Sequence, residues 1–328
     1  MGNFKRILSL LLRVSISIIL LALLFKLNKI DIRSLLNDIK GVNKLFLGLG
    51  FTVFFLGYLL GFLRWRMLLL AAGINISLKK LISSFSGGVF FNVFLPSTIG
   101  GDLVRSADLA GHTRKAKEVI ATVLLDRLSG YIGLVIVVIP AILLGKGVVL
   151  DRVVLSSIAV IIGLLIVILL VLFNSFIYTK ITRFLATPGA KKIKEMVKDM
   201  HAEIHVFRHR RKVIIYNLFL SFFIQIITPV SIYFIALSLG VKINFIYFLI
   251  FMPIIGAITL LPVAIGGLGL RESLFVVYFA KAGVIKQLAL AMSLLSFSFI
   301  VIYGAIGGLI YVLTIHHRRL QCNKPPSV

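Results

Sequence analysis

Charged residues and cysteine are scarce in this sequence. Charged side chains make up 14% of the 328 residues, and the chain has a single cysteine, Cys322. A soluble domain would carry about a quarter charged residues, so the low charge argues against that class. One cysteine excludes an internal disulfide and a cysteine metal cluster.

Catalytic and nucleotide-binding motifs are absent as well. The sequence has no P-loop, no HExxH, no GxSxG and no Cys/His cluster with metal-ligand spacing. No stretch between the apolar runs is long enough to fold as a catalytic or ATP-binding domain. We therefore expect that the protein is not an enzyme and that it binds no metal and no cofactor. Any transport would run down a gradient, couple to an ion or depend on a partner.

Apolar residues dominate instead. They make up 59% of the chain, and the mean hydropathy is +1.08. Many runs reach or approach the roughly 20 residues that cross a bilayer as a helix, which identifies an integral membrane protein. The first run lacks a small-residue cleavage site, so we expect it to be retained as a signal anchor. Six continuous spans are predicted, near residues 7–25, 45–63, 119–144, 153–173, 213–239 and 287–315.

Two shorter apolar segments, 81–95 and 245–261, each run into a Pro-x-x-x-Gly-Gly break that a second helical stretch follows. Residues 95–105 read LPSTIGGDLVR and residues 261–271 read LPVAIGGLGLR, so proline, both glycines and arginine recur in one register. Backbone groups freed by such a break must be buried in protein or line a cavity. Each segment is therefore predicted to be a re-entrant hairpin.

The predicted fold is an all-α polytopic membrane protein, with about six full transmembrane helices and two re-entrant helical hairpins. Three spans separate the hairpins, and because three is odd the hairpins enter from opposite sides. They then form an inverted repeat, as in many secondary transporters. Residues 1–320 are expected to form one transmembrane domain, and residues 321–328 a short disordered tail.

The net charge of +25 is unevenly distributed. Lys and Arg collect in short loops, and most of the 36 fall on the side that would hold both termini. This positive-inside bias predicts cytoplasmic termini in the cell membrane and attraction to anionic headgroups, and it argues against nucleic-acid binding. Segment 174–212 carries apolar residues at helical spacing. That pattern favours a cytoplasmic amphipathic helix over an ordinary basic connector.

Asp126 and Arg127 lie within a predicted span, in the stretch LLDRLSGY. An ionised side chain there costs roughly 2.5–3.5 kcal/mol on insertion scales, so it faces a cavity or a partner. Neighbours on a helix point about 100° apart, and the two cannot neutralise each other side by side. We expect partners such as Arg105, Arg271, Glu272 or a substrate. A structural ion-pair network is the alternative to a functional switch.

The glycine pairs Gly100–Gly101 and Gly266–Gly267 each open a predicted helix. Free N–H groups at a helix start bind anions. An arginine four residues later, Arg105 or Arg271, can hold phosphate through two hydrogen bonds. The alternative is that the glycines let crossing helices pack closely. The repeated arginine favours the anion site.

Asp102 and Glu272 break the symmetry of the repeat. Asp102 either caps the following helix or acts as a proton-linked carboxylate. Glu272 pairs with Arg271 or with another neighbour. Other polar residues at membrane depth either line the same cavity or form interhelical hydrogen bonds. These are Asn92, Ser97, Thr98, Gln225 and Thr228.

The order of these motifs resembles a known family. N-x-x-x-P-x-x-x-G-G-D-x-x-R covers Asn92–Arg105, a span with LLDRL follows, and P-x-x-x-G-G-x-G-x-R-E covers Pro262–Glu272. Together they resemble the flippase-like membrane family over nearly the whole chain. Its best-known members form the N-terminal flippase domain of bacterial lysyl-phosphatidylglycerol synthases, the multiple peptide resistance factors.

The resemblance implies movement of aminoacylated or other anionic phospholipids, or of polyprenyl-linked lipids, between leaflets. Two features depart from it. The chain ends at Val328 without an aminoacyl-transferase domain, so we expect it not to make lysyl-phosphatidylglycerol. The last span lacks an arginine found in relatives, which argues against a fully symmetric mechanism. The positions implied to function are Gly100, Gly101, Asp102, Arg105, Asp126, Arg127, Gly266, Gly267, Gly269, Arg271 and Glu272.

We therefore expect a lipid flippase or scramblase. Arg105 and Arg271 would bind phosphate, Asp126 and Arg127 would form a switchable pair, and a lysine-bearing headgroup would also need a carboxylate. A secondary transporter of a small anionic solute, with a cavity sealed from the bilayer, is one alternative. Another is a non-catalytic membrane partner of a separate synthase or polymer-export enzyme, docked through 174–212. The sequence leaves the lipid, the direction, the energy source and a homodimer open.

Overall fold

The computed structural model describes residues 30–94, 100–145, 152–173, 210–259 and 267–322, with short helical pieces between 15 and 28. Every regular element in these ranges is a helix, so the predicted all-α membrane fold is confirmed. The helices are α2 (Ile32–Lys40), α3 (Lys44–Ala71), α4 (Leu78–Phe94), α5 (Gly100–Thr113), α6 (Ala116–Leu144), α7 (Arg152–Phe173), α10 (Arg211–Ser238), α11 (Phe245–Thr259), α12 (Leu270–Lys281) and α13 (Lys286–Cys322).

Four of these helices are long and apolar enough to cross a membrane. They coincide with four of the predicted spans, and α7 coincides with a fifth. The sixth, 7–25, lies largely outside the described residues, as do the amphipathic segment up to residue 209 and the tail from 323. The four helical spans are Lys44–Ala71, Ala116–Leu144, Arg211–Ser238 and Lys286–Thr314.

Helix α3 continues past its predicted end at residue 63. Arg64 was expected to start a cytoplasmic loop, but the helix runs on to Ala71. Apolar residues resume directly after Arg66, so the helix still has a face to bury. Arg64 itself is only 8% exposed. The boundary prediction was wrong because Arg64 is buried within the helix and does not flank it.

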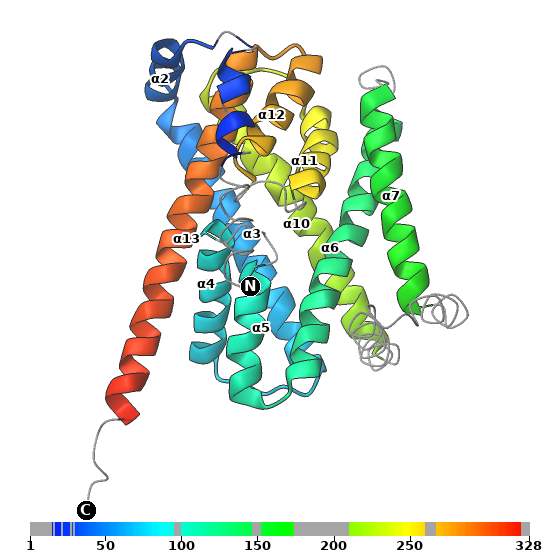
Figure 1. Cartoon of the computed structure of the whole chain (residues 1–328). Coiled ribbons are helices and arrows are strands. Elements are labelled where there is room, and N and C mark those ends of the chain that lie inside the picture. Colours follow the sequence, from blue (N-terminus) through cyan, green and yellow to red (C-terminus); the bar gives the residue numbers. More distant parts are fainter. Residues whose placement is uncertain are drawn as a thin grey trace, which may run out of the picture.

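The two predicted hairpins are both present as helix pairs. Helix α4 packs against α5, and α11 packs against α12. In Figure 1 the first pair occupies the lower half of the molecule and the second pair the upper half. Helix α13 runs alongside both pairs and packs against α4 and α12. The hairpins thus approach from opposite ends, as an inverted repeat requires. Both prolines of the repeat, Pro96 and Pro262, lie outside the described residues.

Small residues let the long helices cross closely. A Cβ on Gly133 of α6 would lie 2.9 Å from the backbone carbonyl carbon of Ser221 on α10. On α3, the carbonyl of Gly50 accepts a 2.8 Å hydrogen bond from the Ser231 hydroxyl of α10. Close approach at small residues, with hydroxyl bonds across the contact, is how helices associate within lipid. These crossings bring α3, α6 and α10 into one bundle.

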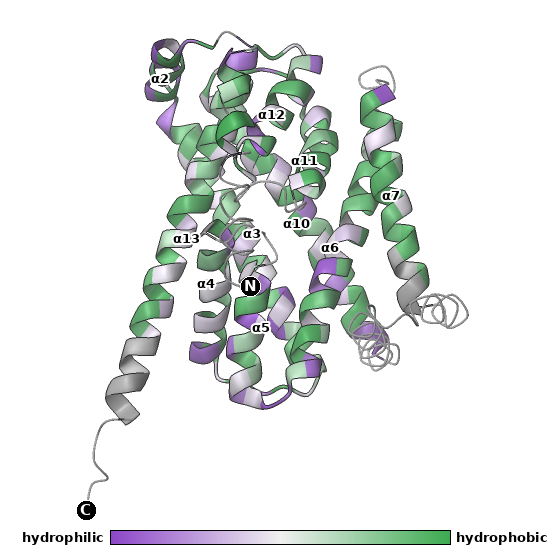
Figure 2. Ribbon diagram, viewed as in Figure 1, coloured by the Kyte–Doolittle hydropathy of each residue, from purple (hydrophilic) through white to green (hydrophobic). Residues whose placement is uncertain are grey.

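Apolar and polar residues separate clearly on this bundle. Figure 2 shows the helices hydrophobic over most of their length, with hydrophilic residues gathered on α5 and on the facing part of α6. Large apolar side chains stay exposed on the outside, among them Leu144 at 80% and Leu45 at 70%. Such a surface needs lipid to cover it. The polar side chains of α5 and α6 are enclosed within this apolar surface.

The inverted repeat predicts opposite accessibility at the outer ends of the two hairpins. In a Cys322→Ser background, Lys80→Cys would place a single thiol beside the start of α4, and Lys286→Cys would place one just after α12. We expect a membrane-impermeant maleimide to react with these thiols from opposite sides. Labelling of both from the same side would contradict the fold. If the termini are cytoplasmic, Lys286→Cys is the thiol labelled in intact cells.

Candidate functional site

Five charged side chains form one connected network between α3, α5 and α6. The Asp126 carboxylate accepts from Arg64 Nε at 2.7 Å and from Arg105 Nη2 at 3.1 Å. The same Arg105 nitrogen lies 2.9 Å from Asp102 Oδ1, and Arg127 Nε lies 2.6 Å from Asp102 Oδ2. Each aspartate thus bridges two arginines. Three guanidinium groups and two carboxylates leave a net charge of +1.

Most of this network is buried. Arg64, Asp102, Arg105 and Asp126 are each 6–8% exposed, whereas the Arg127 side chain is 34% exposed. Breaking a buried ion pair by removing one partner typically costs about 3–5 kcal/mol, because the other charge is left uncompensated. The charges therefore hold α3, α5 and α6 together. Arg127 is the member that is most open to its surroundings.

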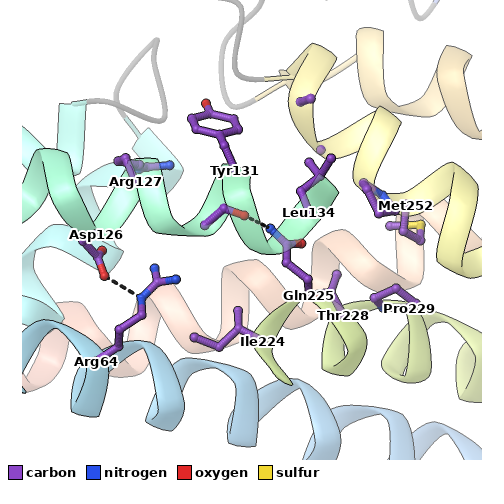
Figure 3. A pocket seen from close by; sticks show the side chains of 14 residues that line it. Arg64, Asp126, Arg127, Tyr131, Leu134, Ile224, Gln225, Thr228, Pro229 and Met252 are labelled. Atoms are coloured by element: carbon purple, nitrogen blue, oxygen red, sulfur yellow. Dashed lines mark hydrogen bonds and ion pairs between the residues drawn. The ribbon is translucent and has the colours of Figure 1, made fainter. Parts of the chain in front are cut away.

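Helix geometry explains how these partners meet. Asp102 and Arg105 are three residues apart on α5 and so share a face. Asp126 and Arg127 are adjacent on α6 and point in different directions. Asp126 faces Arg64 of α3 and Arg105 of α5, while Arg127 reaches Asp102. Figure 3 shows Asp126 turned toward Arg64 and Arg127 turned away. The two do not neutralise each other, as predicted, and Arg105 is one of the partners expected for them.

The glycine pair of the first motif brings α5 against α4. A Cβ on Gly101 would lie 2.0 Å from the Gly88 carbonyl oxygen, so only glycine fits. The Gly101 N–H donates to Asn92 Oδ1 at 3.0 Å, and that backbone donor is therefore occupied. The close approach also places the Arg105 guanidinium 4.5 Å from the Trp65 ring centroid, a cation–π distance. Gly101 therefore has the packing role that was the alternative to an anion site.

Two cavities border the network. The smaller, of about 160 Å³, is lined by all five charged residues and by Tyr58, Gly61, Phe85, Gly88, Val89 and Asn92. The larger, of about 280 Å³, lies between α6, α10 and α11 (Figure 3), and its polar lining includes Tyr131, Gln225 and Thr228. Arg64, Asp126 and Arg127 line both cavities. Asn92 lines the smaller cavity, and Gln225 and Thr228 line the larger one. Gln225 also donates to the Gly130 carbonyl of α6 at 2.8 Å, so both roles weighed for these polar residues occur. Ser97 and Thr98 lie outside the described residues.

The second motif forms a separate buried pair. Arg271 Nη2 lies 2.5 Å from Glu272 Oε1, and Glu272 Oε2 accepts from the Gly269 N–H at 2.6 Å. Arg271 is 8% exposed and Glu272 is fully buried. The Arg271 guanidinium also lies 4.5 Å from the Phe297 ring centroid. Like Arg105, it therefore lies beside a carboxylate and over an aromatic ring, although Arg105 has two carboxylates and two rings as neighbours.

The two motifs differ in where their helices begin. Helix α5 starts at Gly100, which places Arg105 in its second turn. Helix α12 starts only at Leu270, because Gly267 and Gly269 adopt positive φ of 75° and 82° before it. Arg271 consequently lies in the first turn of its helix. Gly266 lies outside the described residues, and neither of the two cavities has a residue of the second motif in its lining.

Arg64 is the one network member that was not among the predicted site residues. Leu63 and Trp65 flank it, and the apolar run resumes within three residues, a pattern that favours a buried charge over a loop. Its Nη1 donates to Ser221 Oγ of α10 at 2.8 Å, which links a fourth helix to the network. Ser221 and Trp65 were also not predicted. A lone serine or tryptophan within an apolar run gives no indication of a site.

Comparison with known proteins places the chain among transmembrane relatives. The family model described as the lysylphosphatidylglycerol synthase TM region matches residues 10–308. A UPF0104 membrane protein of Pyrococcus horikoshii is 27% identical over 275 residues, which cover 76% of this chain and 81% of the relative. A UPF0104 membrane protein of Methanothermobacter thermautotrophicus is 25% identical over 252 residues, covering 70% and 73%.

The contact at Gly101 gives a prediction with a control on the same helix. We expect Gly101→Ala to destabilise the protein by at least about 1–3 kcal/mol, because the new methyl group overlaps the α4 backbone. Gly111 also lies on α5 but has open space around it. Gly111→Ala should be neutral or stabilising, since alanine favours helix over glycine. Thermal unfolding in detergent measures both, and equal midpoints would contradict the packing role.

Proposed function

Since this chain belongs to the lysylphosphatidylglycerol synthase TM region family, we propose that it moves phospholipids between the two leaflets of a membrane. The observation that carries the proposal is the buried network of three arginines and two aspartates that borders two cavities. An excess positive charge inside membrane-spanning helices favours an anion as its ligand. The phosphate of a lipid headgroup is such an anion.

The binding step follows from which bond is most accessible. Arg127 is the most exposed member of the network, so its ion pair with Asp102 is the first that an entering phosphate reaches. A phosphate oxygen that replaces Asp102 on Arg127 preserves the pairing of the guanidinium. The buried Nε of Arg105 has no hydrogen-bond partner among the described residues and is a donor for the same phosphate. The ion pairs are exchanged and no charge is left uncompensated.

The inverted repeat supplies the two directions of access. The first hairpin presents Arg105 and the second presents Arg271 from the opposite end of the molecule. Each arginine lies over an aromatic ring and beside a carboxylate. A headgroup would meet one arginine from each leaflet, and its acyl chains would stay in the bilayer against the exposed apolar surface. We propose the cell membrane as its location, with both termini in the cytoplasm, as the distribution of Lys and Arg favours.

The direct test is lipid movement in proteoliposomes. Phosphatidylglycerol carrying a fluorophore on one acyl chain would be quenched from outside, so that loss of the protected half reports flux. We expect Arg105→Ala and Arg271→Ala each to lower the rate at least tenfold, because each removes a phosphate donor. Arg66→Ala, which removes an arginine from α3 outside the network, should keep the wild-type rate.

Two results would contradict this proposal. A wild-type rate no faster than that of empty liposomes would favour a small anionic solute as substrate, or a role as the membrane partner of another enzyme. Flux that survives both arginine substitutions would mean that the repeated motifs only pack helices.

A further inference from the structure

A third cavity lies apart from the charge network, where the turn between α3 and α4 meets the turn between α5 and α6. It has a volume of about 420 Å³, within the size range of small-molecule sites. In Figure 1 the α5–α6 turn lies at the lower end of the molecule. No member of the network lines this cavity. Its walls are residues 73–77, Lys80, His112, Thr113 and Lys115.

Buried contacts fix the two turns that form the cavity. Gly73 has a positive φ of 72°, which suits the turn after α3, and its carbonyl oxygen accepts a 3.2 Å hydrogen bond from Lys115 Nζ. Ile74 is only 2% exposed. It belongs to an apolar cluster with residues of α3, α4, α5 and α6, among them Trp65, Leu81, Leu109 and Val119. The cavity is therefore a defined feature of the fold.

The charges around this cavity have one sign. Lys80 and Lys115 supply two ammonium groups, and neither forms an ion pair with an acidic residue in the described ranges. His112 adds a third positive charge when it is protonated. Asp108 lies 3.8 Å from His112 Nδ1 but is outside the lining, and its carboxylate accepts a hydrogen bond from Ser84. The lining therefore has a charge of +2 with a neutral histidine, and it favours an anion.

Neutral groups of the lining suit a ligand that is rich in oxygen. Asn75 supplies an amide and Ser77 a hydroxyl, and both groups donate hydrogen bonds. Helices α4 and α6 also begin beside the cavity, at Leu78 and Ala116. The positive ends of two helix dipoles therefore add to the charge of the lysines.

We propose that this cavity is a second phosphate site and that it takes a phosphate monoester. A monoester carries a charge of about −1.5 to −2 at neutral pH and three acceptor oxygens, so it balances the two lysines. A phosphodiester, as proposed for the network, carries about −1 and would leave one lysine uncompensated. The monoester can belong to a lipid headgroup at the membrane surface or to a soluble molecule. The site lies outside both repeated motifs and does not depend on lipid movement.

Glycerol 3-phosphate and phosphatidic acid test the site, because they carry the same phosphate monoester without and with acyl chains. The protein would be held in phosphatidylcholine nanodiscs. Calorimetric titration measures the binding of glycerol 3-phosphate, with glycerol as the control. Native mass spectrometry measures how much phosphatidic acid stays bound when it is mixed into the nanodiscs. We expect at least one of the two to bind with a Kd below about 1 mM, and glycerol not to bind.

Paired substitutions test which lysines hold the phosphate. Lys80→Gln combined with Lys115→Gln removes both ammonium groups and should weaken binding at least about tenfold. Lys79→Gln combined with Lys117→Gln removes the same charge from positions outside the lining, and affinity should stay within about twofold of wild type. Lys115 also bonds to the Gly73 carbonyl. Lys80→Gln alone leaves that bond in place and should still weaken binding at least about threefold.

The outcomes separate the source of the phosphate from the existence of the site. Binding of glycerol 3-phosphate would support a soluble ester, and retention of phosphatidic acid alone would support a lipid headgroup. Binding of neither would overturn the inference. So would equal weakening by the two pairs of substitutions, because general surface charge would then attract the ligand. Phosphatidylglycerol flux without added ligand should be unchanged in Lys80→Gln, so a failure of the proposed function is recognised separately.

Discussion

An ionised side chain inside a bilayer has to be paired, and the described part of this protein is arranged around that requirement. The network takes Arg64 from α3, Asp102 and Arg105 from α5, and Asp126 and Arg127 from α6. A hydrogen bond from Arg64 to a serine adds α10. The charges thus fix α5, one helix of the first hairpin, against the long helices α3, α6 and α10. Because Arg64 and Arg127 border both cavities, the ion pairs that hold the helices together are also the ones a headgroup phosphate would exchange.

The glycines of the two motifs act differently. In the first hairpin they allow close backbone contact between two helices, and in the second they allow a turn before the helix. Gly101 lets α5 approach α4 closely enough for Arg105 to lie over Trp65. In the second hairpin Gly267 and Gly269 instead supply positive φ before the helix, and Arg271 pairs with the next residue. Arg105 and Arg271 therefore have similar neighbours, a carboxylate and an aromatic ring, although the backbone before each arginine differs. Two aspartates shared by three arginines make the first site cationic, whereas the second pair is neutral.

Much of the architecture could be predicted from the sequence, because apolar length, proline and glycine act locally. Helices lie at five of the six predicted spans, four of them long and apolar enough to cross a membrane, and the helix pairs of both hairpins lie where the apolar segments predicted them. The 100° separation of Asp126 and Arg127 predicted partners on other helices. Arg64 was missed because counting it as a loop residue agreed with the charge bias. Its burial depends on which face of α3 packs against α6, and this tertiary contact cannot be predicted from the local sequence.

The central claim is that a lipid phosphate enters the buried network at the ion pair between Arg127 and Asp102. An experimental structure in nanodiscs that contain phosphatidylglycerol tests it directly, since each atom of the exchange would be visible. The account predicts a headgroup phosphate within hydrogen-bond distance of Arg127 and Arg105, with the Arg127–Asp102 contact opened. An intact network, with phosphate density confined to the membrane surface, would contradict it.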